Sequence, residues 1–177
     1  MKNIMKKFIN TKKKKIISRT TLSSDLKKLG VIKGDILIIM CALSEIGYLE
    51  NGFDTLIEVL IDEVGNEGAI MGLSFTYGDK NNSRTYRKNM PPDTGGLNKA
   101  LVSHPKSIRS SHPMNSFVGI GKSIKELLSS HTPNSPSFEP VHKLAINNQG
   151  KMLKIGTIWK SPGITTVHVA QNLLGFK

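Results

Sequence analysis

Residues 36–41, Ile36-Leu37-Ile38-Ile39-Met40-Cys41, form a continuous apolar run rich in β-branched side chains, and a turn at 33–35 (Lys-Gly-Asp) precedes them. A run of this kind is typical of a strand buried on both faces of a parallel sheet. Apolar residues then recur at helical spacing over 56–64, and residues 69–75 repeat the strand pattern. Strand, helix and strand with short connections make a βαβ unit, whose strands run parallel. The sequence therefore predicts an α/β fold.

The ends of these two strands are candidate positions for a functional site. In α/β sheets, ligands bind beyond the carboxyl ends of the strands. This rule selects the loop that follows Cys41 and the stretch that follows Phe75. Residues 78–96 are polar and rich in Gly, Pro and Asn, and a loop of this length in a compact domain usually has a function.

The rest of the chain continues the alternation of helices and strands, without an internal repeat. A helix capped by Thr21 or Ser23 is predicted to end at Gly30, with its leucines on one face. The further predicted helices and strands cover residues 97–101, 116–120 (strand), 124–128, 151–158 (strand) and 165 onward. We expect one domain over residues 21–177, a single-domain α/β sandwich around a mainly parallel central sheet built from βαβ units.

The net charge of +12 is concentrated at the N-terminus, because eight of the 25 basic residues lie in residues 1–20, where no acid occurs. We interpret these residues as a basic tail. Three roles are open for it: a solvated start of the chain, a patch for nucleic acid or an anionic membrane, and long-range attraction of an anionic ligand. Phe8 is the only aromatic residue of the tail, which disfavours stacking on bases and hence nucleic-acid binding.

Composition also restricts the location and the metal chemistry. No run approaches the roughly 20 apolar residues of a membrane span, and no signal peptide is recognisable, so we expect a cytoplasmic protein. A single cysteine, Cys41, excludes an internal disulfide; it is either a small core residue or a nucleophile paired with a histidine. His104, His131 and His142 are scattered, so we expect them at the surface and predict no metal site.

The densest cluster of polar residues is 109–117, Arg-Ser-Ser-His-Pro-Met-Asn-Ser-Phe. Arginine and hydroxyl groups suit phosphate oxygens. His112 is the side chain of this cluster whose ordinary pKa allows proton transfer near neutrality. The cluster therefore predicts either a functional histidine or a histidine of a surface loop.

The sequence resembles the aminoglycoside 3-N-acetyltransferase family, also called the antibiotic acetyltransferase type. The most specific match is the Arg-Ser-x-His-Pro-x-x-Ser pattern of residues 109–116. The other matching pieces occur in family order, and they are Leu29-Gly30-Val31 with Gly34-Asp35, Leu43 to Gly52, Val64-Gly65-Asn66-Glu67-Gly68, Phe75-Thr76, and Thr165 with His168-Val169-Ala170. The resemblance implies an α/β sandwich that moves an acetyl group from acetyl-CoA directly to an amine of an aminoglycoside or related amino sugar.

The resemblance also implies roles for individual residues. His112 would be the general base, and Gln171 would stand at the position of a family glutamate near that base. We expect Asp93 and His168 on the side of the small-molecule amine acceptor. The residues expected to face acetyl-CoA are Met40, Cys41, Ala42, Leu43, Thr76, Arg109, Ser110 and Ser116.

Two departures from the family pattern suggest an alternative. Family members begin the loop after the first strand with His-Ser-Ser-Leu, whereas this chain has Met-Cys-Ala-Leu at 40–43. Gln171 is a neutral amide, which can orient an imidazole but cannot stabilise an imidazolium by charge. The family also continues beyond position 177, so we expect the domain to be C-terminally short. The alternative is therefore a catalytically impaired or vestigial CoA-binding paralogue, and a homodimer is a further possibility.

Overall fold

The computed structural model describes residues 15–78, 81, 85–156 and 165–175. A five-stranded sheet with the order β5-β6-β4-β2-β7 forms its centre. The strands are β2 (Ile36–Cys41), β4 (Ala69–Leu73), β5 (Ile108–Arg109), β6 (Phe117–Ile120) and β7 (Gly150–Ile155). β2 pairs in parallel with β4 and β7, while β6 is antiparallel to β4 and β5. Only β6 in this sheet therefore runs against the other strands, which confirms the predicted α/β fold with a mainly parallel sheet.

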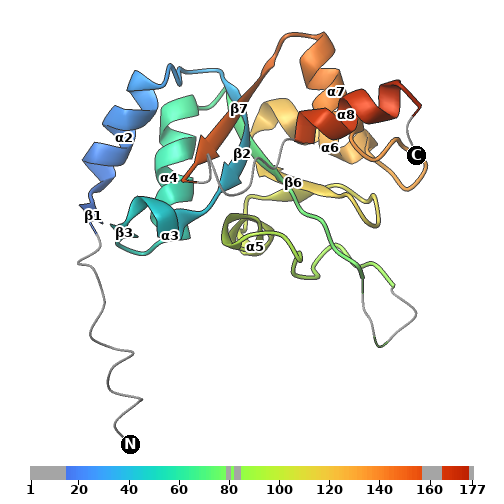
Figure 1. Ribbon diagram of the computed structural model, residues 1–177, viewed down its shortest axis with the longest axis horizontal. Coiled ribbons are helices and arrows are strands. Elements are labelled where there is room, and N and C mark those ends of the chain that lie inside the picture. The colour runs from blue at the N-terminus through green and yellow to red at the C-terminus, as the bar shows by residue number, and fades with distance from the viewer. Residues whose placement is uncertain (1–14, 79–80, 82–84, 157–164, 176–177) are drawn as a thin grey trace, which may run out of the picture.

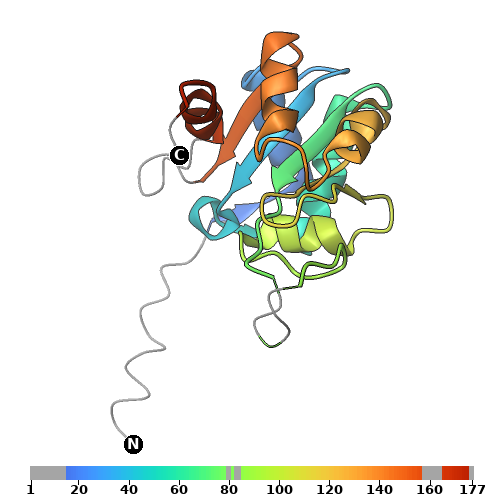
Figure 2. The same cartoon turned by 90° about the vertical axis from the view of Figure 1, so that its right-hand side faces the viewer.

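Helices cover both faces of the sheet (Figures 1 and 2). One face packs against α2 (Arg19–Lys28), α4 (Phe53–Val64) and α5 (Gly96–Ser103). The other packs against η2 (Lys122–Ile124), α6 (Lys125–Ser130), α7 (Glu139–Ile146) and α8 (Thr165–Leu173). In Figure 2, α7 lies in front of the sheet and α2 behind it. No helix among the described residues has the length and apolar character needed to cross a bilayer.

The apolar run of β2 supplies both cores because its side chains alternate between the two faces. Leu37 and Ile39 lie in the core beneath α2, α4 and α5, whereas Ile36 and Ile38 lie in the core beneath α6, α7 and α8. All four side chains are at most 7% exposed. Burial on both faces is the reason why the run is continuously apolar rather than alternating with polar residues.

The N-terminal region differs from the predicted helix. Ser18, and not Thr21 or Ser23, caps α2: its Oγ accepts a hydrogen bond from the Thr21 backbone N–H at 3.0 Å. Helix α2 therefore begins at Arg19, and Leu29 lies past its end with 69% of its surface exposed.

The structure also adds short elements that the periodicity did not indicate. α3 (Leu43–Ile46) follows β2, and β1 (Ile16–Ile17) pairs in parallel with β3 (Tyr48–Leu49). Residues 1–14 of the basic tail lie outside the described residues.

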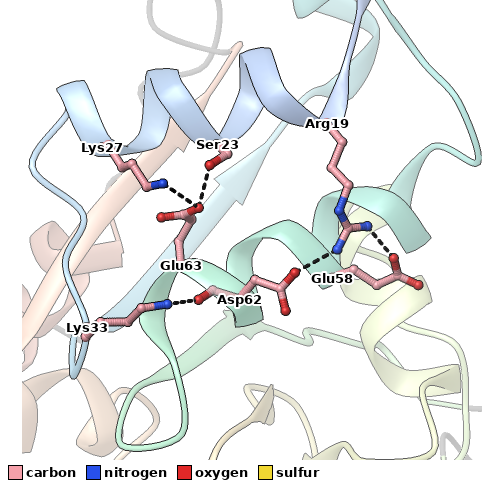
Figure 3. A network of polar contacts seen from close by, with 7 residues as sticks. All are labelled: Arg19, Ser23, Lys27, Lys33, Glu58, Asp62 and Glu63. Carbon is pink, nitrogen blue, oxygen red and sulfur yellow. Dashed lines mark hydrogen bonds and ion pairs between the residues drawn. The ribbon is translucent and has the colours of Figure 1, made fainter.

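Polar contacts attach α2 to α4 along their exposed sides (Figure 3). Arg19 donates to Glu58 at 2.5 Å and to Asp62 at 2.7 Å. Glu63 accepts a hydrogen bond from Ser23 at 2.6 Å, and its carboxylate lies 3.6 Å from the Lys27 ammonium group. Two cations of α2 thus offset part of the charge of three carboxylates of α4, although solvent-exposed ion pairs contribute little to stability individually.

A more deeply buried ion pair joins β2 to β7 at the amino end of the sheet. Asp35, which is 9% exposed, accepts hydrogen bonds from the Ile32 backbone N–H at 2.9 Å and from the Lys151 ammonium group at 2.8 Å. Lys151 also donates to the Gly30 carbonyl at 3.1 Å. The lysine therefore connects the edge strand to the turn that precedes the central strand.

We expect Lys151→Met to lower the free energy of unfolding by about 1–3 kcal/mol, because it leaves the Asp35 carboxylate without its cation. Urea unfolding followed by circular dichroism measures the change. Lys122→Met is the matched control, since Lys122 is an exposed lysine of η2. Equal stability of the two variants would contradict a structural role for the Asp35–Lys151 pair.

Candidate functional site

The loops that follow β2, β4 and β5 begin at the same edge of the sheet, because these strands run in the same direction. The antiparallel strand β6 begins at this edge as well. Ser74 donates its backbone N–H to the Ser116 carbonyl at 2.7 Å, and Thr76 donates to the Met114 carbonyl at 3.1 Å. The stretch after β4 is thus bound along the 110–116 loop, and the carboxyl edge contains the polar residues that the sequence selected.

The guanidinium group of Arg109 lies at the centre of these loops. It donates to Ser116 Oγ at 3.1 Å, to the Ser74 carbonyl at 3.0 Å, to the Lys88 carbonyl at 2.9 Å and to the Met90 carbonyl. The side chain is 7% exposed, and burial lowers its pKa from the ordinary arginine value. Arg109 therefore holds three backbone segments together, and these contacts use most of its N–H donors.

Tyr86 is a residue of this cluster that sequence reasoning missed. Its hydroxyl group donates to the Ser110 carbonyl at 2.9 Å, and the Arg109 guanidinium lies 5.3 Å from the centre of its ring. A tyrosine inside a long polar loop gives no periodic signal, so only the folded chain brings it to Arg109.

The predicted hydroxyl residues come together here but bond within the chain. Ser116 Oγ donates to the Ser74 carbonyl at 2.8 Å, and Thr76 Oγ1 accepts from the Gly78 N–H at 3.1 Å. Ser110 Oγ accepts from the Phe117 N–H at 2.9 Å. Ser110 and Ser116 are fully buried, and Thr76 is 3% exposed. These groups therefore stabilise the loops that surround the site.

His112 is held in the 110–116 loop with 8% of its surface exposed. Its Nδ1 lies 3.1 Å from the Asn115 backbone N–H, which can only donate, so the neutral ring carries its proton on Nε2. Burial lowers the pKa of His112 below its ordinary value. At neutral pH, His112 is consequently an uncharged ring whose Nε2–H is a hydrogen-bond donor.

His131 was expected at the surface, and this prediction was wrong. The side chain is fully buried and stacks on His112, with ring centres 4.8 Å apart and planes inclined by 11°. Its Nε2 lies 3.2 Å from the Pro136 carbonyl and its Nδ1 lies 3.0 Å from Ser110 Oγ. The scattered spacing of histidines in the sequence contains no signal for a contact between the end of α6 and the 110–116 loop.

Ser110 and His131 have the spacing of an activated nucleophile and its base, yet neither is accessible. Both side chains are 0% exposed, so an acyl donor cannot reach the Ser110 hydroxyl group in this structure. The pair therefore has a structural function in the unliganded chain.

Gln171 lies beside His168, three residues away on α8. Its Oε1 lies 2.9 Å from His168 Nδ1, and both side chains are exposed. From the sequence we expect Gln171 near His112, but in the structure Gln171 is hydrogen-bonded to His168. A carbonyl oxygen only accepts, so in the neutral form of His168 the proton lies on Nδ1 and the lone pair on Nε2.

His168 also stacks on Phe138, with ring centres 5.2 Å apart. Phe138 lines a cavity of about 230 Å³ between α7 and α8, to which Glu139 and Val169 contribute. Phe138 further contacts Phe117, edge to face, at 6.5 Å, and Phe117 contacts His131 at 5.9 Å. A continuous series of ring contacts thus connects His168 to the ring pair His112–His131.

The residues after β2 border a second, larger hollow. Leu43 lines a groove of about 640 Å³ together with Tyr48, Phe53, Gly96 and their neighbours. Helices α4 and α5 begin at this groove, and neither has a side-chain cap at its N-terminus. In α4 the Asp54 N–H already donates to the Asn51 carbonyl at 3.2 Å, so the other first-turn N–H groups of the two helices are the candidates for binding an anionic ligand.

Cys41 and Asp93, two further predicted site residues, show no sign of activation. Burial raises the pKa of the Cys41 thiol to about 11, so the thiol stays protonated at neutral pH and the nucleophile alternative loses support. Asp93 accepts from the Tyr77 backbone N–H at 2.8 Å and donates its own N–H to the Phe75 carbonyl at 2.8 Å. Asp93 thus closes the base of the long loop. Within the described residues, no three side chains of the kinds that bind metals gather at one point.

We expect the stability of the protein to fall as the pH is lowered from 6.5 toward 4, because burial lowers the pKa of His131 from 6.5 to about 4. Below pH 6.5 the unfolded chain binds a proton at this residue that the folded chain does not, so the fold loses up to about 3 kcal/mol over this interval. Urea unfolding at several pH values, compared between the unaltered chain and His131→Phe, measures this contribution.

The Phe variant should show the shallower dependence on pH, and His104→Phe, the control at a half-buried histidine after α5, should keep the original slope. Identical slopes in all three proteins would show that His131 is not a buried neutral histidine.

Comparisons with known proteins agree with the resemblance found in the sequence. The sequence profile of the aminoglycoside 3-N-acetyltransferase family matches residues 38–177. Aminoglycoside N(3)-acetyltransferase IX of Micromonospora chalcea is 30% identical over an alignment of 179 residues. The match covers 89% of this chain and 62% of the relative. The chain therefore spans about three fifths of the length of that relative.

Solved structures of the family have the same fold. The complex of AAC-IIIb with CoASH superposes with a TM-score of 0.77 at 26% identity, covering 90% of this chain and 66% of that protein. AAC-VIa bound to sisomicin gives a TM-score of 0.71 at 25% identity, covering 87% and 64%. With the profile match over most of its length, the chain belongs to the aminoglycoside 3-N-acetyltransferase family.

Proposed function

We propose that this domain transfers an acetyl group from acetyl-CoA to an amine of an aminoglycoside or a related amino sugar. The observation that carries the proposal is the likeness, over 90% of the chain, to a family structure solved with CoASH. Family membership over residues 38–177 supports the same reaction class. Two parts of the structure support the proposal, one for binding of the acetyl donor and one for deprotonation of the acceptor amine.

The groove after β2 suits the donor. The N-termini of α4 and α5 have no side-chain caps and carry the positive ends of two helix dipoles, which favour phosphate groups, while the Asp54 carboxylate in the first turn of α4 opposes them. Gly52 precedes α4 with a φ of 55°, a conformation that glycine adopts without a steric cost. The apolar wall formed by Leu43, Leu49 and Phe53 suits the pantetheine arm.

The acceptor amine must lose a proton during the reaction. An alkyl amine has a reference pKa of about 10.4, so it is protonated at neutral pH and cannot attack a thioester in that form. In the proposed step the amine nitrogen forms a bond to the thioester carbonyl carbon, the carbon–sulfur bond breaks, the thiolate of CoA leaves, and a base takes the proton of the amine.

The hydrogen bonds distinguish between two histidines for this proton. His112, the base predicted from the sequence, has Nδ1 occupied by the Asn115 N–H and a proton on Nε2, which favours donation to the thioester carbonyl. His168 donates Nδ1–H to Gln171 and keeps the Nε2 lone pair, which favours acceptance of the proton. We therefore assign hydrogen-bond donation to His112 and take His168, which the rings of Phe138, Phe117 and His131 separate from His112, as the candidate base to be tested.

The second candidate function is CoA binding without turnover, and Gln171 favours it. Its neutral amide orients His168 but does not offset the charge that the imidazole acquires on accepting a proton. On this alternative the groove after β2 binds CoA and no acceptor is acetylated.

The test is release of CoA thiol from acetyl-CoA over a panel of aminoglycosides and amino sugars. We expect activity with at least one acceptor, a fall of about 10²–10⁴-fold for His168→Ala, and a comparable fall for His112→Ala. CoA binding measured by calorimetry should persist in both variants. Gln171→Glu should raise the rate, because a carboxylate stabilises the imidazolium.

Binding of CoA without thiol release for any acceptor, with Gln171→Glu also inactive, would contradict acetyl transfer and leave the CoA-binding alternative. Full activity of His168→Ala would contradict the assignment of the base while leaving the reaction intact.

A further inference from the structure

The stacked ring pair contains a histidine that the proposed reaction does not use. We propose that His131 is a positioning residue for His112: its immobile ring is a platform that holds the His112 imidazole in one plane and therefore in one tautomer. The inference rests on the proposed role of His112 as a hydrogen-bond donor at the site. It gives a role at the site to His131, which the sequence analysis expected at the surface.

The polar atoms of His131 are all committed, which fixes its own ring. The Pro136 carbonyl can only accept, so Nε2 of His131 carries the proton and Nδ1 has a lone pair. Ser110 Oγ, which already accepts from the Phe117 N–H, then donates its proton to that Nδ1. Rotation of the His131 ring would break both bonds inside a fully buried site, at a cost of about 1–3 kcal/mol for each group left unpaired.

Two further contacts connect this platform to the segment it supports. The Ser111 backbone N–H donates to the His131 carbonyl at 3.1 Å, so the main chains of the two histidines are joined one residue away from His112. The Phe117 ring lies 5.9 Å from the His131 ring at an inclination of 59°. The ring of His131 is therefore confined by Phe117 as well as by its hydrogen bonds.

The ring plane of His112 determines its tautomer. A hydrogen bond to an imidazole nitrogen must lie close to the ring plane, where the lone pair is. The Asn115 N–H reaches Nδ1 only while the plane is held, and the stack at 11° holds it. If the ring were free to turn, Nδ1 would lose this donor and the proton of the neutral ring would be free to move between the two nitrogens.

The platform must also be uncharged, since a proton on Nδ1 of His131 would remove the lone pair that accepts the Ser110 hydroxyl proton. The titratable groups that face His131 are His112 from the 110–116 loop and Glu139 and Lys143 from α7. Burial is the largest influence and lowers the pKa of His131 to about 4; His112 and Lys143 act in the same direction, and Glu139 opposes them. His131 is consequently neutral at the pH at which acetyl transfer would occur.

Two variants separate the ring of His131 from its hydrogen bonds. His131→Phe keeps an aromatic ring beneath His112 and removes both polar bonds, whereas His131→Gln keeps a donor and an acceptor and removes the ring. His104→Gln is the matched control, because it removes a half-buried histidine after α5. Histidine side-chain NMR of the isotopically labelled full chain reports the tautomer of each ring without requiring activity.

We expect the unaltered chain and His131→Phe to show His112 with a single proton on Nε2, and His131→Gln to show a signal averaged over two tautomers. With an acetyl acceptor, kcat should fall about tenfold or more in His131→Gln with little change in KM for acetyl-CoA, and much less in His131→Phe. The control should match the unaltered chain in both measurements.

An unchanged His112 signal in His131→Gln, or equal losses of kcat in the Phe and Gln variants, would overturn the proposal. If a variant does not fold, the NMR spectrum of the unaltered chain still tests the proposal. A His131 ring that is protonated at pH 7, or that carries its single proton on Nδ1, would overturn the proposal as well. Absence of acetyl transfer in every protein would count against the proposed function alone, because the NMR signals test the platform in the resting chain.

Discussion

The site depends on the buried guanidinium group of Arg109. Removing a cation from water is costly, and burial lowers the pKa of this group accordingly. Hydrogen bonds to the carbonyls of Ser74, Lys88 and Met90 and to the Ser116 hydroxyl compensate for the lost hydration. Because these acceptors belong to the stretch after β4, to the long loop and to the start of β6, one side chain fixes their relative positions. The remaining features of the carboxyl edge are built on that arrangement.

The hydrogen-bond partners of His112, His131 and His168 are backbone groups, the Ser110 hydroxyl and the Gln171 amide. Asn115 and Pro136 determine which nitrogen of His112 and of His131 carries the proton, and the Gln171 amide does the same for His168. Because the Asn115 N–H can only donate and the Pro136 carbonyl can only accept, the neutral rings of His112 and His131 each acquire a defined protonation site. The stacked pair is uncharged at neutral pH, because burial lowers the pKa of both rings. This division of roles follows from hydrogen-bond chemistry and not from the residue types alone.

The sequence predicted four of the five strands of the sheet, β2, β4, β6 and β7, but neither β5 nor the contacts within the polar cluster around His112. The apolar run 36–41 and the helix that follows determine a βαβ unit, because side-chain periodicity is a local property. The pattern around His112 identifies the cluster for a similar reason. Burial of His131 and the position of Tyr86 depend on contacts between distant segments, which no local spacing encodes. Gln171 is a different case, because its partner His168 lies three residues away on the same helix, a spacing that the local sequence does encode.

The measurement that tests the account most directly is a crystal structure of the full chain with CoA. We expect the phosphates beside the N-termini of α4 and α5, the pantetheine arm along the groove that Leu43 lines, and the sulfur at the carboxyl edge of the sheet within reach of the His112 donor. CoA bound on another face of the domain, or a sulfur far from both His112 and His168, would contradict the proposed site and the roles assigned to these histidines.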